Sequence, residues 1–158
     1  MFTLTKQENA GILSVHLVGD IDETVHLERS IGAIKGKLRV LTRGVVRINS
    51  AGTRNWIHYF ESLRSQNIEF WFEECSPAIV DQLNLISNFR AGARVESIYL
   101  PFICEKCRSE LIGLFSCEAL IAKALVIPSQ ACSKCGGAAR FDEIHEEYLG
   151  FLRRMGSD

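Results

Sequence analysis

Strand-like segments recur along the first hundred residues. Leu13, Val15 and Leu17 occupy alternate positions and therefore share one face of a short strand. Similar apolar or β-branched runs predict five strands, at Phe2 to Thr5, Ile12 to Val18, Leu38 to Ile48 with an interruption at Gly44, Ile68 to Phe72, and Arg94 to Leu100. This part of the chain is therefore expected to contain a sheet.

Three segments between these strands have helical periodicity instead. Leu27, Ile31 and Ile34 recur at intervals of four and three residues, which predicts a short helix that ends before Gly36. A second helix is expected to open at Ser50, and its apolar positions are Trp56, Ile57, Phe60 and Leu63.

The third helix has the clearest start signal in the chain. Ser76 suits the N-cap, and Pro77 suits the first helical position because the N–H that proline lacks would have no partner there. The apolar stripe that follows is Ile79, Val80, Leu83 and Ile86. The elements run β-β-α-β-α-β-α-β, which predicts an α/β (α+β) fold with a mixed sheet flanked by helices.

Cysteine usage changes after residue 100. Cys75 is the one cysteine of six that lies in the first hundred residues, and Pro101 interrupts a strand-like run. These observations predict one domain over residues 1–100 and a second over residues 101–158. A C-terminal helix is expected to close the second domain, with Ile144, Tyr148, Phe151 and Leu152 on the face that packs on the protein.

Four cysteines form two C-x-x-C pairs, Cys104 with Cys107 and Cys132 with Cys135. Two intervening residues let one tight turn aim both sulfurs at a single ion, and two such turns complete a tetrahedral four-sulfur zinc site. Two glycines after the second pair suit a turn that needs positive φ. Because the cysteines fill all four coordination positions, we expect a zinc ribbon with one structural zinc ion. A reduced quartet without metal and a pair of redox motifs are the alternatives.

Composition is that of an ordinary globular protein, with 158 residues, 47% hydrophobic and 23% charged. No segment approaches the ~20 apolar residues of a membrane span, and the amino terminus does not resemble a signal peptide. We therefore expect a cytoplasmic protein with no membrane partner. Cysteines are reduced in that compartment, which favours metal over disulfides. Cys75 and Cys117 have no ligand spacing and are expected to be buried hydrophobic residues.

The charge balance argues against nucleic acid as the main partner. The chain has 18 basic and 19 acidic residues, for a net charge of -1. Residues 101–158 carry seven basic and eight acidic side chains, whereas an interface with phosphates needs clustered lysine and arginine. Nucleic-acid binding through the zinc ribbon is therefore kept as an alternative only.

Three segments resemble the STAS family, the fold of bacterial anti-sigma-factor antagonists. They are GDID (Gly19 to Asp22), RINSAGTRNW (Arg47 to Trp56) and IEFWFEECSPAIVDQLN (Ile68 to Asn84). The resemblance implies a STAS-like mixed sheet and a regulatory module without catalysis that binds a partner protein. It places the working surface around the loop before the second helix, at Asn49, Ser50, Ala51, Gly52 and Arg54.

Ser50 falls on the position that a kinase phosphorylates in antagonists of this type. The resemblance therefore implies a phosphoprotein of signal transduction, whose partners are a serine kinase or anti-sigma-like regulator and a phosphatase. Two positions depart from the family pattern, because Asn49 replaces the usual acidic residue and Leu41 stands where many members carry aspartate.

The residues themselves leave two roles open for Ser50. As an N-cap its hydroxyl would accept a backbone hydrogen bond worth about 1 kcal/mol. A phosphate at the same point would meet the free N–H groups of the helix start and the side chain of Arg54.

Other functions have less support. A sensor of nucleotides or other anions is an alternative within the same family, although the chain has no Gly-rich phosphate loop. An enzyme is not expected, because no Ser-His-acid arrangement and no open metal position is present in the sequence. The zinc ribbon either covers the sheet and extends the core or docks a partner.

Overall fold

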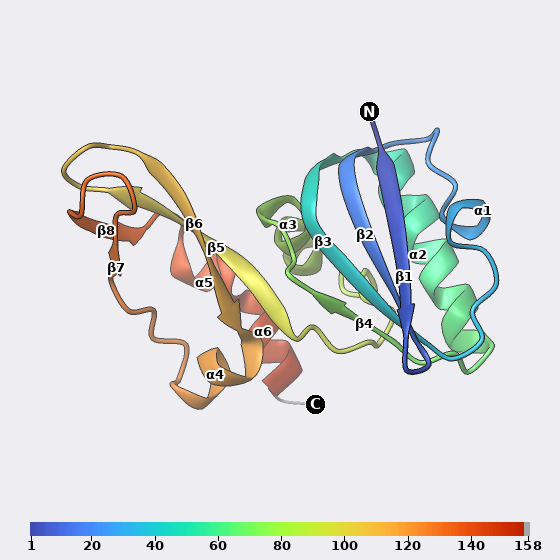
Figure 1. Cartoon of the computed structure of the whole chain (residues 1–158). Coiled ribbons are helices and arrows are strands. Elements are labelled where there is room, and N and C mark those ends of the chain that lie inside the picture. The colour runs from blue at the N-terminus through green and yellow to red at the C-terminus, as the bar shows by residue number, and fades with distance from the viewer. Residues whose placement is uncertain (157–158) are drawn as a thin grey trace.

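The expected fold class is confirmed. The computed structural model describes residues 1–156, which form a mixed α+β fold with two four-stranded sheets and six helices (Figure 1). The first eight elements follow the expected order β-β-α-β-α-β-α-β. Over this described part of the chain, no helix has the length and apolar character needed to cross a membrane.

Four strands form the first sheet, in the order β1 (Thr3–Asn9), β2 (Ile12–Ile21), β3 (Lys37–Ile48) and β4 (Phe70–Glu73). β1 and β2 are antiparallel, and the two turn residues between them, Ala10 and Gly11, both have positive φ, as a tight hairpin requires. β2, β3 and β4 are parallel, so helices must carry the chain from one to the next. The carboxyl ends of these strands consequently meet at one edge of the sheet.

The sequence pattern predicted that Gly44 interrupts the third strand, but the strand is not interrupted there. β3 continues through this residue, which is paired with Val18 of β2. A Cβ atom at Gly44 would lie 2.7 Å from Cγ2 of Val18, so any side chain would force the two strands apart. The glycine therefore permits a close approach where the register of β2 shifts.

Three helices pack against this sheet, α1 (Leu27–Ile31), α2 (Ser50–Ser65) and α3 (Pro77–Leu85). α1 ends earlier than predicted, because Gly32 adopts a φ of 74° at its C-terminus and leaves Ile34 beyond the helix. The apolar face of α2 is confirmed, since Trp56, Phe60 and Leu63 are buried in the core.

α3 begins as its sequence predicts. The Ser76 side chain accepts a hydrogen bond from the backbone N–H of Ile79 at 3.4 Å, and Pro77 is the first helical residue. The stripe of Ile79, Val80 and Leu83 is buried. This helix lies between the first sheet and the C-terminal part of the chain.

The second sheet has the order β6-β5-β8-β7, with bounds β6 Glu110–Ser116, β5 Ser97–Cys104, β8 Ala138–Phe141 and β7 Gln130–Ala131. β5 was expected in the first sheet, and its beginning does lie parallel to the end of β4 and the residues after it: Phe72 bridges Val95 and Cys75 bridges Ile98, with backbone hydrogen bonds of 2.8–3.1 Å. The continuous ladder of β5, over seven residue pairs, is nevertheless formed with β6, because the chain returns directly as an antiparallel hairpin.

Pro101 lies inside β5, opposite Ile112, and does not interrupt the strand. Its carbonyl accepts a hydrogen bond from the N–H of Asp142 at 3.0 Å. The predicted boundary between residues 100 and 101 therefore falls within a continuous strand. The division into domains 1–100 and 101–158 stays a prediction.

The expected C-terminal helix is two short helices, α5 (His145–Tyr148) and α6 (Gly150–Gly156). Asn84 of α3 lies at the break, where its amide donates to the Tyr148 carbonyl and accepts from the Phe151 N–H, both at 2.8 Å. These bonds replace those that a continuous helix would form. The expected face is buried at Tyr148, Phe151 and Leu152, whereas Ile144 is exposed.

A single hydrophobic cluster connects the two sheets. Ile98 and Leu100 of β5 and Leu149 beside α5 belong to the same cluster as Trp56 and Val80 of the first part. The far end of the second sheet, which carries the cysteine turns, points away from the first sheet (Figure 1). The helix α4 (Cys117–Ala122) follows β6 and contributes Cys117 and Leu120 to the core.

Candidate functional site

Two antiparallel strand ends bring the four paired cysteines together. Cys104 is the last residue of β5, and Cys107 lies in the turn that leads to β6. Cys132 and Cys135 lie in the turn between β7 and β8. Because β8 is hydrogen-bonded to β5, the two turns face each other at the same end of the sheet.

The sulfur positions fit a tetrahedral metal site. All four Sγ atoms lie within 4.8 Å of one another. Cys104 Sγ is 3.5 Å from Cys135 Sγ, and Cys107 Sγ is 3.7 Å from Cys132 Sγ. A tetrahedral ion with metal–sulfur bonds of about 2.3 Å separates its ligands by about 3.8 Å. The cluster could therefore hold a metal ion with little movement.

Backbone N–H groups point at the sulfurs from both turns. The N–H of Cys107 donates to Cys104, that of Lys134 to Cys132, and that of Gly137 to Cys135, each at 3.4 Å. Such bonds stabilise thiolates over thiols. The turn also explains one of the two glycines, since a Cβ at Gly137 would lie 3.3 Å from the sulfurs of Cys104 and Cys135.

The surrounding turns shift the pKa values of three of these cysteines in different directions. Hydrogen bonding to the hydroxyl and backbone of Ser109 lowers the pKa of Cys107 to about 6. The backbone N–H of Cys107 lowers the pKa of Cys104. For Cys135, the Gly137 N–H acts in the same direction, but the neighbouring sulfurs outweigh it and raise the pKa to about 11. A bound cation would offset this crowding of thiolates.

Acidification is expected to release the metal. Each ligand must be a thiolate, so protons compete with the ion, and affinity falls as the pH falls. We expect retention at neutral pH and loss below about pH 5, measured as transfer to a chromogenic chelator. In Ser109→Ala, which lacks the hydroxyl beside Cys107, release should begin at a higher pH. Equal metal retention from pH 7 to pH 4 would contradict this expectation.

The two remaining cysteines are buried, as expected. Cys75 has no exposed surface and Cys117 is 2% exposed. Burial raises the pKa of both thiols, that of Cys117 to about 12. They are therefore neutral thiols in the core, apart from the turns that carry the other four cysteines.

The second candidate site lies where the carboxyl ends of β2 and β3 meet. The segments GDID and RINSAG are brought together there, because Asp20 pairs with Arg47 and Ile21 with Ile48 in the parallel ladder. Asp20 also forms an ion pair with Arg47 at 3.3 Å. The N–H of Asn49 donates to the Ile21 carbonyl at 3.1 Å and fixes the start of α2 against β2.

Asn49, not Ser50, is the N-cap of α2. Asn49 Oδ1 accepts a hydrogen bond from the Gly52 N–H at 2.7 Å, and Asn49 Nδ2 donates to Glu23 at 3.0 Å. The bond to Glu23 favours Asn49 as the cap because it holds the amide in place. Ser50 is consequently the first helical residue, and its side chain is exposed.

The other residues of the predicted partner surface differ in accessibility. Arg54 is exposed one turn after Ser50, and Ala51 is half-buried. Gly52 is buried, and a Cβ there would lie 2.3 Å from the Ile21 carbonyl oxygen, so its role is the close packing of α2 on β2. Leu41 is 3% exposed and lies in the sheet.

Substitutions at Asn49 and Ser50 are expected to show which of the two residues caps α2. Asn49→Ala is expected to lower the free energy of unfolding by about 1 kcal/mol, because the Gly52 N–H loses its partner. Ser50→Ala should change it by less than about 0.5 kcal/mol, since no described residue bonds to the hydroxyl. Urea denaturation of both variants beside the parent measures this. A larger loss in Ser50→Ala would restore serine as the cap.

A sequence signal for Asn49 did exist, because asparagine is as favourable at an N-cap as serine. The hydrogen bond to Glu23 that decides between them joins residues 26 positions apart, and sequence spacing does not reveal it.

No protein-family model matches the chain, and no curated protein matches it in sequence. We therefore infer the function from the geometry of the four cysteines and of the loop before α2.

Proposed function

We propose that the chain is a non-enzymatic regulatory module of the anti-sigma-factor-antagonist kind. It binds a partner protein through the loop and helix that start at Ser50, and phosphorylation of Ser50 switches this binding. A serine kinase or anti-sigma-like regulator and a phosphatase are the matching partners. The four-cysteine cluster holds one structural zinc ion.

The observation that carries the proposal is the division of roles at the start of α2. Asn49 supplies the cap, so the exposed Ser50 hydroxyl is free of any duty in the fold. A phosphate can be added there without removing the bond that starts the helix. Had Ser50 been the cap, the same modification would have destroyed it.

A phosphate on Ser50 would strongly change the charge of the surface around it. Free N–H groups and the positive end of the helix dipole attract an anion at this point, and Arg54 lies one turn away. Glu23 and Asp20 are close to the same loop and add negative charge beside it. A dianion on Ser50 would therefore convert a mixed surface into an acidic one and exclude a partner that docks on the unmodified loop.

Zinc is the metal that suits the cluster best. Four thiolates at tetrahedral spacing favour zinc or iron over harder ions. Four protein ligands leave no position for a catalytic water, which supports a structural role. Elemental analysis of the purified protein distinguishes zinc from iron.

The proposal is tested on protein isolated from its own cells. Intact mass with fragmentation should place one phosphate on Ser50, and affinity capture should recover a partner with the parent but at least tenfold less with Ser50→Glu. Ser65→Glu, an exposed serine at the other end of α2, is the matched control and should capture normally. An unmodified Ser50 under several growth conditions, with equal capture by Ser50→Glu, would overturn the switch.

A further inference from the structure

β6 is the edge strand of the second sheet, and no described strand pairs with its outer side. Its seven residues alternate between exposed and half-buried side chains. The exposed ones include Ile112 and Leu114, with 52% and 51% of their surface accessible. An edge strand with exposed apolar side chains and no charge in its middle is a template for pairing with a further strand.

The backbone hydrogen bonds of the β5–β6 hairpin determine which groups of β6 are free to pair. At one end, the N–H of Cys104 donates to the Ser109 carbonyl at 2.9 Å, and at the other end the N–H of Cys117 donates to the Glu96 carbonyl at 2.9 Å. Both pairs continue the register of the ladder, in which bonded and non-bonded pairs alternate. The N–H and C=O groups directed at the open edge therefore belong to Glu110, Ile112, Leu114 and Ser116.

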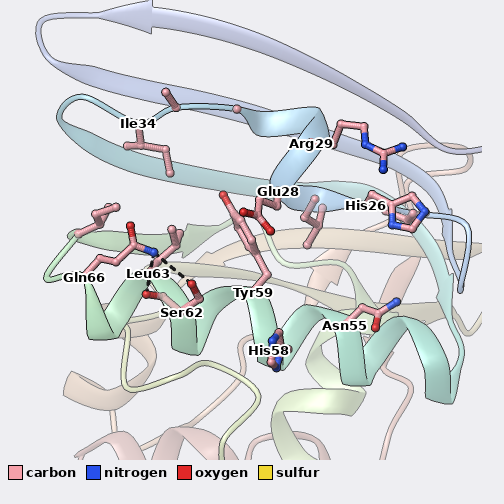
Figure 2. A pocket seen from close by; sticks show the side chains of 15 residues that line it. His26, Glu28, Arg29, Ile34, Asn55, His58, Tyr59, Ser62, Leu63 and Gln66 are labelled. Carbon is pink, nitrogen blue, oxygen red and sulfur yellow. Dashed lines mark hydrogen bonds between the residues drawn. The ribbon is translucent and has the colours of Figure 1, made fainter.

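The other sheet edges are better protected. β1 carries the charged residues Lys6 and Glu8, which hinder pairing with a further strand. The Lys6 ammonium group also donates to the carbonyl of Ile31, the last residue of α1, at 3.2 Å. α1 packs beside β1 and faces α2 across a groove (Figure 2). β4 is bridged to β5, and β7 has two residues. Among the described edge strands, β6 is thus the one most open to pairing.

The sequence of β6 is complementary to itself in the antiparallel direction. A two-fold axis through Gly113 places Ile112 opposite Leu114 of a second copy, and the reverse pair forms on the other side of the axis. Both residues direct their backbone groups outward, so each pair can exchange two hydrogen bonds. The same register places Glu110 opposite Ser116 of the second copy, so that no like charges face each other.

The charges beyond the ends of β6 also match. Arg108 is exposed in the turn before the strand, and Glu118 is exposed in the first turn of α4 after it. In the register about Gly113, Arg108 of one copy lies at the same end of the joined strands as Glu118 of the other. These opposite charges favour the antiparallel orientation.

We propose that the chain forms a two-fold symmetric dimer in which β6 pairs with β6 of a second copy and joins the two second sheets into one. The contact uses the same residues of both copies, so it closes on itself and leaves no open β6 edge. Side-chain contact between Ile112 and Leu114 across the axis adds to the backbone hydrogen bonds.

Sedimentation velocity of the full chain over a range of concentrations tests the dimer. A reversible transition from monomer to dimer is expected, with a Kd of about 10–100 µM for an interface of this small size. Ile112→Lys places a charge in the middle of the paired edge and should raise the Kd at least tenfold. Val46→Lys, at a residue of β3 that is 65% exposed, is the matched control and should dimerise as the parent does.

Ile112→Pro tests the backbone pairing. The N–H of Ile112 points away from β5, so proline leaves the β5–β6 ladder intact and removes a donor from the open edge. This variant should keep the dispersed ¹⁵N–¹H spectrum of the parent and stay monomeric.

Amide hydrogen exchange in the parent tests the same bonds without a substitution. Exchange of the Ile112 and Leu114 N–H groups should slow at least threefold between about 20 µM and 1 mM protein. Exchange at Gly113, which is bonded to β5 in both states, should change less.

Two results would overturn the proposal. A chain that stays monomeric up to about 1 mM excludes the second copy and leaves the edge to a strand of a different protein. A dimer that both Ile112→Lys and Ile112→Pro retain with the parent's Kd is formed through another surface.

Discussion

Replacing both Cys132 and Cys135 by serine is expected to abolish metal binding and to unfold the cysteine-bearing end of the second sheet. β7 pairs with β8 through two residue pairs, and β8 pairs with β5 through three. So few pairs cannot hold two turns in place without the ion. Structural zinc contributes about 10–16 kcal/mol in peptides that fold around it, and a loss of that order exceeds what the short strands supply.

Elemental analysis and a ¹⁵N–¹H spectrum measure this outcome. Zinc should fall from one ion per chain to none, and amide signals of residues 104–109 and 130–138 should lose their dispersion. Signals of the first sheet should persist, because the cysteine turns lie at the far end of the second sheet, away from the first (Figure 1).

Ser133→Ala, an exposed residue of the same turn, is the matched control and should keep its metal and its spectrum. Retention of the metal by the double variant would contradict the four-sulfur site. Collapse of the whole spectrum would contradict the local effect and would make the cysteine-bearing end integral to the fold.

Trp56→Ala is expected to be the most destabilising single substitution in the core of the first part. The indole has no exposed surface. Its ring centroid lies 4.8 Å from that of Phe60, 5.6 Å from that of Phe72 and 5.0 Å from that of Phe89. Its N–H also donates to the Phe89 carbonyl at 3.1 Å. Removing the ring leaves a large cavity, which costs about 3–5 kcal/mol.

Urea denaturation followed by far-ultraviolet circular dichroism measures the loss. Trp56→Phe keeps a stacked ring but leaves the Phe89 carbonyl without its donor, so a smaller loss of about 1–3 kcal/mol is expected. It also provides a folded comparison if the alanine variant does not fold, since domains of this size are stable by only about 5–15 kcal/mol. A change below about 1 kcal/mol in Trp56→Ala would show that the cavity collapses.

Local sequence predicted the elements whose signals lie within a few residues. Ser76 and Pro77 determine the start of α3 because the cap bond and the missing N–H act within one turn. The spacing of Cys104 with Cys107 and of Cys132 with Cys135 predicted the cluster, because a turn of two residues aims both sulfurs in one direction.

Elements that depend on distant neighbours were misassigned or incompletely predicted. Gly44 was expected to interrupt a strand, because nothing nearby in sequence reveals that Val18 approaches it. β5 was assigned to the first sheet because strand character does not specify which strand is the partner. Ser50 was considered as a cap because serine and asparagine are equivalent there until Glu23 is brought beside Asn49.

The sequence by itself thus determined the order of the first eight elements, the buried face of α2 and which four cysteines come together. These features follow from periodicity and spacing, which act along the chain. Only the tertiary structure decided which sheet β5 joins and which residue caps α2. Each of these depends on contacts between residues far apart in sequence, because packing and hydrogen bonding select among alternatives that are locally equal.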